Sequence, residues 1–147
     1  MPLAVFQTNI KAEAFNDDFA VGLTNILADR LHRDGQDISV HIHPSQILYC
    51  GGTKEPSGYL ILYTSRGFGD IERRRQLSQA ILDFIKDKLK VPNLNRFMVY
   101  MQTTKADDIG LDGGLLSDRY GCMAEGGPFD VRYSKRQAEC SPMKGGP

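Results

Sequence analysis

The apolar residues of this chain form the same pattern twice, 58 positions apart. Between about Asp18 and Leu31, and again between Gly69 and Leu89, they recur at helical spacing on one face. When the first stripe is shifted by 58, five pairs of positions coincide: Phe19 and Leu77, Leu23 and Ile81, Ile26 and Phe84, Leu27 and Ile85, and Leu31 and Leu89. One amphipathic helix is therefore used twice. Asn16 or Asp17 is predicted to cap the start of the first copy, and Gly35 to end it.

A strand pattern flanks each helix on both sides. The first helix stands between an apolar segment at 2–8 and the alternating segment "DISVHIH" at 37–43. The second stands between "GYLILYTS" at 58–65 and "RFMVYMQ" at 96–102. This tandem βαβ repeat predicts an α+β, two-layer fold, in which a four-stranded mixed sheet carries two helices on one face. Right-handed crossovers would make the two strands of each unit parallel.

Such a sheet leaves one face and two edges without a cover. The uncovered face would carry apolar and aromatic side chains, and the edge strands would offer free backbone groups. Closed oligomerisation removes both liabilities, so we expect a homo-oligomer.

Composition narrows the class of protein. The chain has 147 residues, and its 18 acidic residues balance its 18 basic ones, so no strong field for nucleic acid or an anionic membrane is expected. No apolar run reaches the roughly 20 residues needed to cross a bilayer. The N-terminus lacks the features of a secretory signal, which predicts a cytoplasmic protein whose export would bypass the signal-peptide route. Three cysteines at irregular spacing suit a reducing compartment.

The chain divides at about residue 116. Residues 1–116 hold the repeat and form one predicted domain, whereas residues 117–147 contain glycines and prolines without a periodic apolar face. We interpret the second segment as a flexible C-terminal extension, in which "PFDVRY" at 128–133 could dock locally as a strand.

Pro2 allows two interpretations. Proline lacks an amide donor, so it is tolerated at the first position of a strand, and this purely structural role is the commoner one. A small second residue generally also permits removal of Met1. Pro2 would then be a free secondary amine, a base that no internal side chain provides.

Five features in order resemble macrophage migration inhibitory factor and its D-dopachrome tautomerase relatives. They are Pro2, "QTNI" at 7–10, "VHIHPSQ" at 40–46, "GGTKEP" at 51–56 and "ADDIG" at 106–110. The resemblance runs from residue 1 to about 116. It implies a homotrimer of double βαβ subunits whose three sheets line a central barrel. It also implies an N-terminal proline that tautomerises phenylpyruvate-type acids and dopachrome, and cytokine activity after secretion without a signal peptide.

The resemblance also assigns site residues. Pro2 is the implied catalytic base, and the implied substrate-binding positions are Arg33, Ser65, Tyr100, Met98 and Ile109. Arg33 stands where the family has a lysine, and its planar fork can hold a carboxylate in two places. Met98 stands where relatives have a tyrosine, and Tyr100 where they have an asparagine from the neighbouring subunit. Tyr100 lies on the same strand face as Met98 and could supply the missing hydroxyl.

The function predicted from these residues is that of an isomerase. It would tautomerise an enolisable keto acid with Pro2 as general base, without a cofactor or metal, because burial and a nearby cation lower the pKa of an amine towards neutrality. Cytokine-like signalling through a cell-surface receptor accompanies this activity in the resemblance. The alternative is a receptor-binding module in which catalysis is vestigial, and the loss of the family tyrosine at Met98 favours it.

Two further motifs have simpler explanations. His41 and His43 share one strand face, but no acid or cysteine stands at clear ligand spacing, so a structural role is favoured over a metal site. "ERRR" at 72–75 is favoured as a solvated helix face. Arginines in this region of distant relatives bind acidic substrates, which leaves decarboxylase or dehalogenase chemistry as a weaker alternative.

Overall fold

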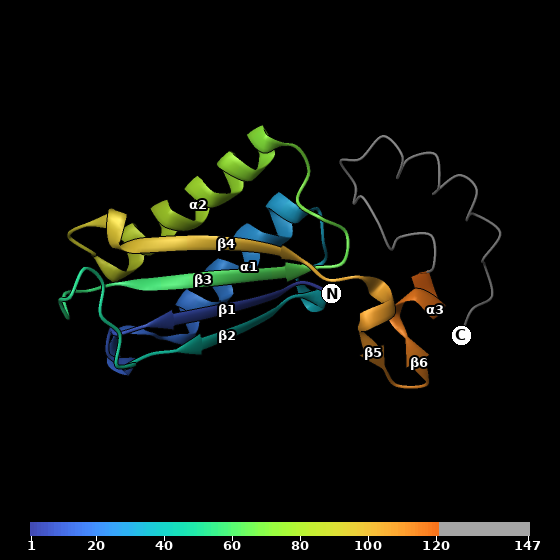
Figure 1. The fold of residues 1–147 in the computed structure, drawn as a ribbon, viewed down its shortest axis with the longest axis horizontal. Helices are drawn as coiled ribbons and strands as arrows, with labels where there is room; N and C mark the ends of the chain where they lie inside the picture. Colours follow the sequence, from blue (N-terminus) through green and yellow to red (C-terminus); the bar gives the residue numbers. More distant parts are fainter. Residues whose placement is uncertain (121–147) are drawn as a thin grey trace.

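The computed structural model describes residues 1–120 and contains a four-stranded sheet with the order β2-β1-β3-β4 (Figure 1). The strands are β1 (Leu3–Thr8), β2 (Ser39–His43), β3 (Gly58–Thr64) and β4 (Phe97–Thr103). β1 pairs with β2 in parallel and β3 with β4 in parallel, whereas the central strands β1 and β3 are antiparallel. The predicted tandem βαβ repeat with a mixed sheet is confirmed.

Two long helices cover one face of this sheet, as Figure 1 shows. They are α1 (Asp17–Leu31) and α2 (Ile71–Leu89). The predicted stripes supply the buried residues of both helices: Phe19, Leu23, Leu27 and Leu31 from α1, and Leu77, Ile81 and Ile85 from α2. These side chains join Ala4, Phe6, Leu60 and Leu62 of the central strands in one core cluster. Burial of each large apolar side chain contributes about 1.5–3 kcal/mol, which makes this layer the main source of stability.

The two helices approach closely at a glycine. A Cβ atom placed on Gly22 would lie 2.8 Å from the ring of Phe84, closer than real side chains pack. The ring of Phe84 also lies 5.0 Å from that of Phe19, centroid to centroid. Glycine has a low helix propensity, but at position 22 it leaves room for an aromatic contact between the two halves of the repeat.

The predicted start of α1 is confirmed, and its predicted end is wrong. Asn16 caps its start, because the side-chain oxygen accepts a hydrogen bond from the Phe19 amide at 3.1 Å. The prediction that Gly35 ends the helix is wrong. His32 takes the left-handed conformation at φ 51° and closes the last turn, while Gly35 begins the short 3-10 helix η2 (Gly35–Asp37). Left-handed backbone is commonest for glycine but is also open to histidine.

Short elements complete the described chain. Three further 3-10 helices precede α1, β4 and β5 in turn: η1 (Ala12–Ala14), η3 (Leu94–Arg96) and η4 (Ala106–Asp108). A two-stranded hairpin follows, made of β5 (Gly110–Leu111) and β6 (Gly114–Leu115), and then α3 (Leu116–Tyr120). α3 begins at the predicted domain boundary, which stays a prediction. Most of the predicted extension, including "PFDVRY" at 128–133, lies outside the described residues. No helix in residues 1–120 has the length and apolar character needed to span a membrane.

The opposite face of the sheet has no helix on it. Its residues follow from the strand registers: Leu3, Val5 and Gln7; Ser39, His41 and His43; Tyr59, Ile61 and Tyr63; and Met98, Tyr100 and Gln102. We call this set the uncovered face. None of its members is Lys, Arg, Asp or Glu. Leu3, Met98 and Tyr100 are among the exposed large hydrophobic residues of the described chain.

Candidate active site

Pro2 lies fully buried just before β1. Its carbonyl oxygen accepts a hydrogen bond from the Ser39 amide at 3.0 Å, which fixes the start of β1 against the start of β2. On the other side, Leu3 registers with Tyr63 near the end of β3. A proline costs no ladder hydrogen bond at this position, because it precedes the first paired residue.

The free amine at this point is shifted towards its neutral form. Met1 is present, so this amine belongs to Met1 and the Pro2 nitrogen is an amide. Burial lowers the pKa of the Met1 amine below its ordinary value, and the positive charges of Arg33 and Arg66 lower it further. Asp37 acts in the opposite direction and raises it. The net effect favours the neutral form of the amine.

Arg33 reaches this region because of how α1 ends. It follows the left-handed residue His32, and its amide donates to the Ala28 carbonyl at 3.0 Å, which fixes the backbone at the end of α1. Its side chain is half-buried. Its positive charge acts on the N-terminal amine, and its role in binding a substrate stays a prediction.

The sequence analysis missed Arg66. This residue follows Ser65, just after β3, and is half-buried. Its amide donates to the Thr64 hydroxyl at 3.4 Å, and Thr64 in turn accepts from the Thr104 amide at 2.9 Å through its carbonyl. The antiparallel pairing of β1 with β3 was the signal that could have located it, because the residues after β3 must lie beside the start of β1.

Ser65 directly follows β3, whose end pairs with the start of β1, and Ile109 lies between η4 and β5. Figure 1 shows the end of β3 and the β5–β6 hairpin on the same side of the sheet as the N-terminus. Ser65 is 3% exposed, so it offers little side-chain surface. Ile109 is half-buried between η4 and β5, where its carbonyl accepts a hydrogen bond from the Leu116 amide at 2.8 Å. The roles of both residues in binding a substrate stay predictions.

Within one chain, Met98 and Tyr100 lie away from the other predicted site residues. Both lie on the uncovered face of β4, 51% and 49% exposed, and the Tyr100 hydroxyl lies 3.7 Å from the Met98 sulfur as a donor. Met98 registers with Tyr59, four residues before Tyr63 along β3, which places it about 13 Å along the strand from the start of β1. Tyr100 registers with Ile61, two residues before Tyr63, so it is set back from the start of β1 as well.

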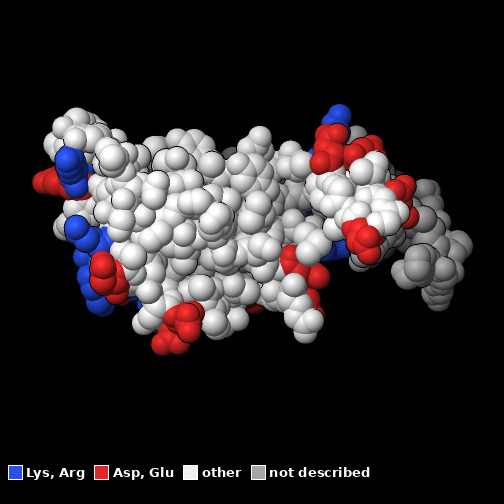
Figure 2. Space-filling model, turned by 90° about the horizontal axis from the view of Figure 1, so that it is seen from below, with Lys and Arg blue, Asp and Glu red and all other residues white. Residues whose placement is uncertain are grey.

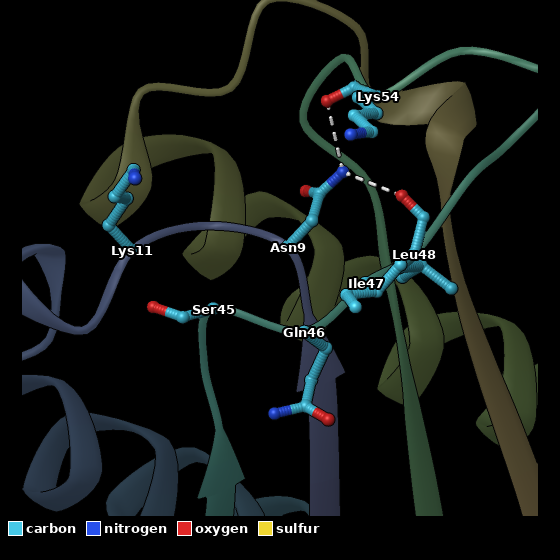
Figure 3. Close-up of a pocket in the computed structure, with 7 residues that line it drawn as sticks. All are labelled: Asn9, Lys11, Ser45, Gln46, Ile47, Leu48 and Lys54. Atoms are coloured by element: carbon cyan, nitrogen blue, oxygen red, sulfur yellow. Dashed lines mark hydrogen bonds between the residues drawn. The ribbon is translucent and has the colours of Figure 1, made fainter.

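A pocket at the other end of β1 contains none of the predicted site residues (Figure 3). Its lining is Asn9, Lys11, Ser45, Gln46, Ile47, Leu48 and Lys54. The Asn9 side chain donates to the carbonyls of Leu48 and Lys54 at 3.1 and 3.2 Å. Asn9 therefore holds the loop that follows β2, and "QTNI" serves here as a structural motif.

Known proteins are similar to this chain over most of its length. The sequence model of the family described as "Macrophage migration inhibitory factor (MIF)" matches residues 1–117. A macrophage migration inhibitory factor homolog of Trichinella spiralis is 30% identical over 113 residues, which cover 77% of this chain and 97% of that protein. Macrophage migration inhibitory factor of Rattus norvegicus is 25% identical over 117 residues, covering 80% of this chain and all of the relative.

Solved structures agree with the sequence comparison. The macrophage migration inhibitory factor of Trichinella spiralis superposes with a TM-score of 0.71 at 28% identity, over 77% of this chain and 98% of that one. A homologue from Prochlorococcus marinus has a TM-score of 0.67 at 19% identity, covers 78% of this chain and 98% of its own, and supports the fold alone. The family match and the fold agree, and the chain belongs to the macrophage migration inhibitory factor family.

Proposed function

We propose that this protein is a tautomerase in which Pro2, freed by removal of Met1, is the general base. The substrates are enolisable keto acids of the phenylpyruvate type, or dopachrome. The observation that carries the proposal is the environment of the N-terminal amine, whose pKa is lowered by burial, Arg33 and Arg66. A Pro2 amine would start one residue further into the protein, where Pro2 is fully buried.

The reaction requires two proton transfers. The neutral Pro2 nitrogen takes a proton from the carbon beside the carbonyl, and the electrons of that C–H bond form the carbon–carbon double bond. The electrons of the C=O π bond move to the oxygen, which takes a proton from water, and the protonated Pro2 returns its proton to water. The reverse reaction returns the proton from Pro2 to carbon. The Arg33 guanidinium binds the substrate carboxylate, and the backbone amide of Ser65 contacts the substrate. No cofactor or metal takes part.

A homotrimer completes the site in this proposal. The uncovered face has no Lys, Arg, Asp or Glu and includes exposed Leu3, Met98 and Tyr100, so a solvated monomer would expose much apolar surface. Figure 2 views the molecule from below, on the side of β2, where charged residues lie at the two ends and along the lower margin and the centre of the view is free of them. Ile109 and a neighbouring copy's Tyr100 and Met98 would then line the substrate cleft.

The proposal is tested by intact mass together with a tautomerase assay on phenylpyruvate. We expect a mass that lacks Met1, and we expect Pro2→Gly to lower kcat by at least about 100-fold, in the range typical for loss of a general base. A protein that retains Met1 through a larger second residue, Pro2→Leu, should be inactive as well. Light scattering after size exclusion should give three chains in both variants. Full activity in either variant would refute the role of Pro2.

The second candidate is a receptor-binding, cytokine-like module with vestigial catalysis. Met98 favours it, because this position lacks the hydroxyl that relatives have and the Tyr100 hydroxyl is directed to the Met98 sulfur. Covalent labelling with an electrophile at neutral pH separates the two candidates. Selective labelling of Pro2 supports the enzyme, whereas labelling no faster than at lysines supports the module. In both cases we propose a cytoplasmic protein that also acts outside cells after leaderless export.

A further inference from the structure

Arg66 is the second cation beside the N-terminal amine, and the proposed mechanism assigns it no contact with the substrate. The antiparallel register pairs Leu3 with Tyr63, so the residues after β3 run past the residues before β1. Continuing this register by one step places Thr64 beside Pro2, with Arg66 two residues further along. The pairing of the strands therefore puts Arg66 at the candidate active site, and its charge acts on the amine there.

The turn that carries Arg66 is held on both sides. Ser65 before it and Phe68 after it are each 3% exposed, and Phe68 belongs to the core cluster. Gly67 has φ 74°, in the left-handed region that glycine adopts without strain. The Arg66 amide donates to the Thr64 hydroxyl. The backbone of Arg66 is therefore fixed, and its half-buried side chain extends from a defined point beside the amine.

The other cation, Arg33, reaches the amine from a different element. Arg33 follows the end of α1, whereas Arg66 follows the end of β3, and both side chains are half-buried. Of the charges in residues 1–120 that act on this amine, Asp37 is the one carboxylate, and its effect is the smallest. Asp37 is exposed, so water and salt screen its charge. The base thus lies between two guanidinium groups and one screened carboxylate.

A keto acid with one carboxylate needs one of these guanidinium groups, because a single planar fork can hold both carboxylate oxygens. Arg33 has this role in the proposed function, on which the present inference rests. We propose that Arg66 binds a second carboxylate, so that the preferred substrates of this protein are enolisable keto diacids. Pro2 then takes the proton from the carbon that lies beside the keto group on the side of the second carboxylate. The chemical steps are otherwise those given above.

Two keto acids of equal length test this substrate class. 2-Oxoglutarate and 2-oxopentanoate differ only in a terminal carboxylate or methyl group, and NMR in D₂O measures exchange of their C3 hydrogens. We expect kcat/KM to be at least about 10-fold higher for the diacid, as for a charged hydrogen bond, and the ratio to fall to about 1 in Arg66→Gln. Arg66→Lys should keep part of the preference. The exposed Arg30 is the control, and Arg30→Gln should keep the parent ratio.

The ratio separates binding from a purely electrostatic role. If Arg66 only lowered the pKa of the base, its loss would slow both substrates alike and leave the ratio unchanged. An unchanged ratio in Arg66→Gln, or a parent ratio of about 1, would therefore overturn the inference. Circular dichroism of each variant shows whether the fold is kept.

Calorimetry with glutarate and pentanoate, which lack the keto group, gives a readout that does not depend on catalysis. Glutarate should bind the parent at least about 10-fold more tightly than pentanoate, and Arg66→Gln should remove the difference. Equal affinities in the parent would overturn the inference. A preference for glutarate without exchange of either keto acid would refute the tautomerase and leave the diacid site in place. Exchange of both keto acids without a preference would support the tautomerase and refute the diacid site.

Discussion

The two halves of the repeat end their long helices in the same way and then diverge. His32 after α1 and Lys90 after α2 have φ angles of 51° and 53°, and their amides donate to the carbonyls four residues earlier, in Ala28 and Lys86. The next residue is Arg33 in the first half, half-buried near the N-terminal amine. In the second half it is Val91, 6% exposed and part of the core.

The difference between Arg33 and Val91 shows that the repeat builds the same fold twice but forms the candidate site only once. The matched helix ends bring the chain back to the sheet in both halves, but only in the first half is the next position exposed enough to hold a charged residue. Only the first half begins with a chain terminus. The corresponding strand β3 is preceded by Ser57, which is 1% exposed and whose amide donates to Asn9 Oδ1 at 2.9 Å. An amine and a cation therefore meet in one half alone.

The largest expected effect on stability comes from placing an arginine, as found at position 33, at the corresponding position 91. Val91→Arg places an unpaired charge in the core and should lower the free energy of unfolding by about 3–5 kcal/mol. Arg33→Val, the reciprocal change, should lower it by less than about 1 kcal/mol, because Arg33 is half-exposed. Urea denaturation measures both. Equal losses would mean that the two positions after the caps are equivalent in burial.

An intermediate effect is expected on catalysis. Arg33→Gln removes a charged hydrogen-bond donor, worth about 1.5–3 kcal/mol, so kcat/KM for phenylpyruvate should fall about 10- to 100-fold. Loss of the cation also raises the pKa of the N-terminal amine. Since the base acts when neutral, the rising limb of the pH profile should move to higher pH.

Arg66→Gln should move that limb in the same direction but less, because Arg33 is the larger of the two charge effects on the amine. The exposed Arg30 is the matched control, and Arg30→Gln should leave the limb in place. A limb that stays unmoved in Arg33→Gln would show that the guanidinium does not act on the base.

The smallest effect tests the backbone strain at the end of α2. Lys90→Gly removes the Cβ atom from a left-handed residue and should raise the free energy of unfolding by about 0.5–1 kcal/mol. Lys88→Gly, two residues earlier and inside α2, should lower it by about 0.5–1 kcal/mol. Thermal unfolding of both variants measures the difference in sign. A loss of stability in Lys90→Gly would mean that side-chain contacts outweigh the backbone conformation at this cap.

The sequence predicted the repeat well because its signal is local. Helical spacing of residues such as Leu23 and Ile81 is visible in a short window, and the Asn16 cap acts on an amide three residues away. The end of α1 was placed wrongly at Gly35, because the preference of glycine for left-handed backbone is statistical and His32 adopted it first. Arg66 was missed because its relation to the N-terminus depends on a strand pairing across some 60 residues.

The sequence by itself determined which residues are apolar, how often they recur, and hence that two βαβ units would share one core. Only the tertiary structure decided which charges surround the N-terminal amine and where the turn after β3 holds Arg66. The reason is physical: periodic burial depends on neighbours within a few turns of chain, whereas electrostatic and ligand geometry depends on distances between segments that the pairing of the strands sets.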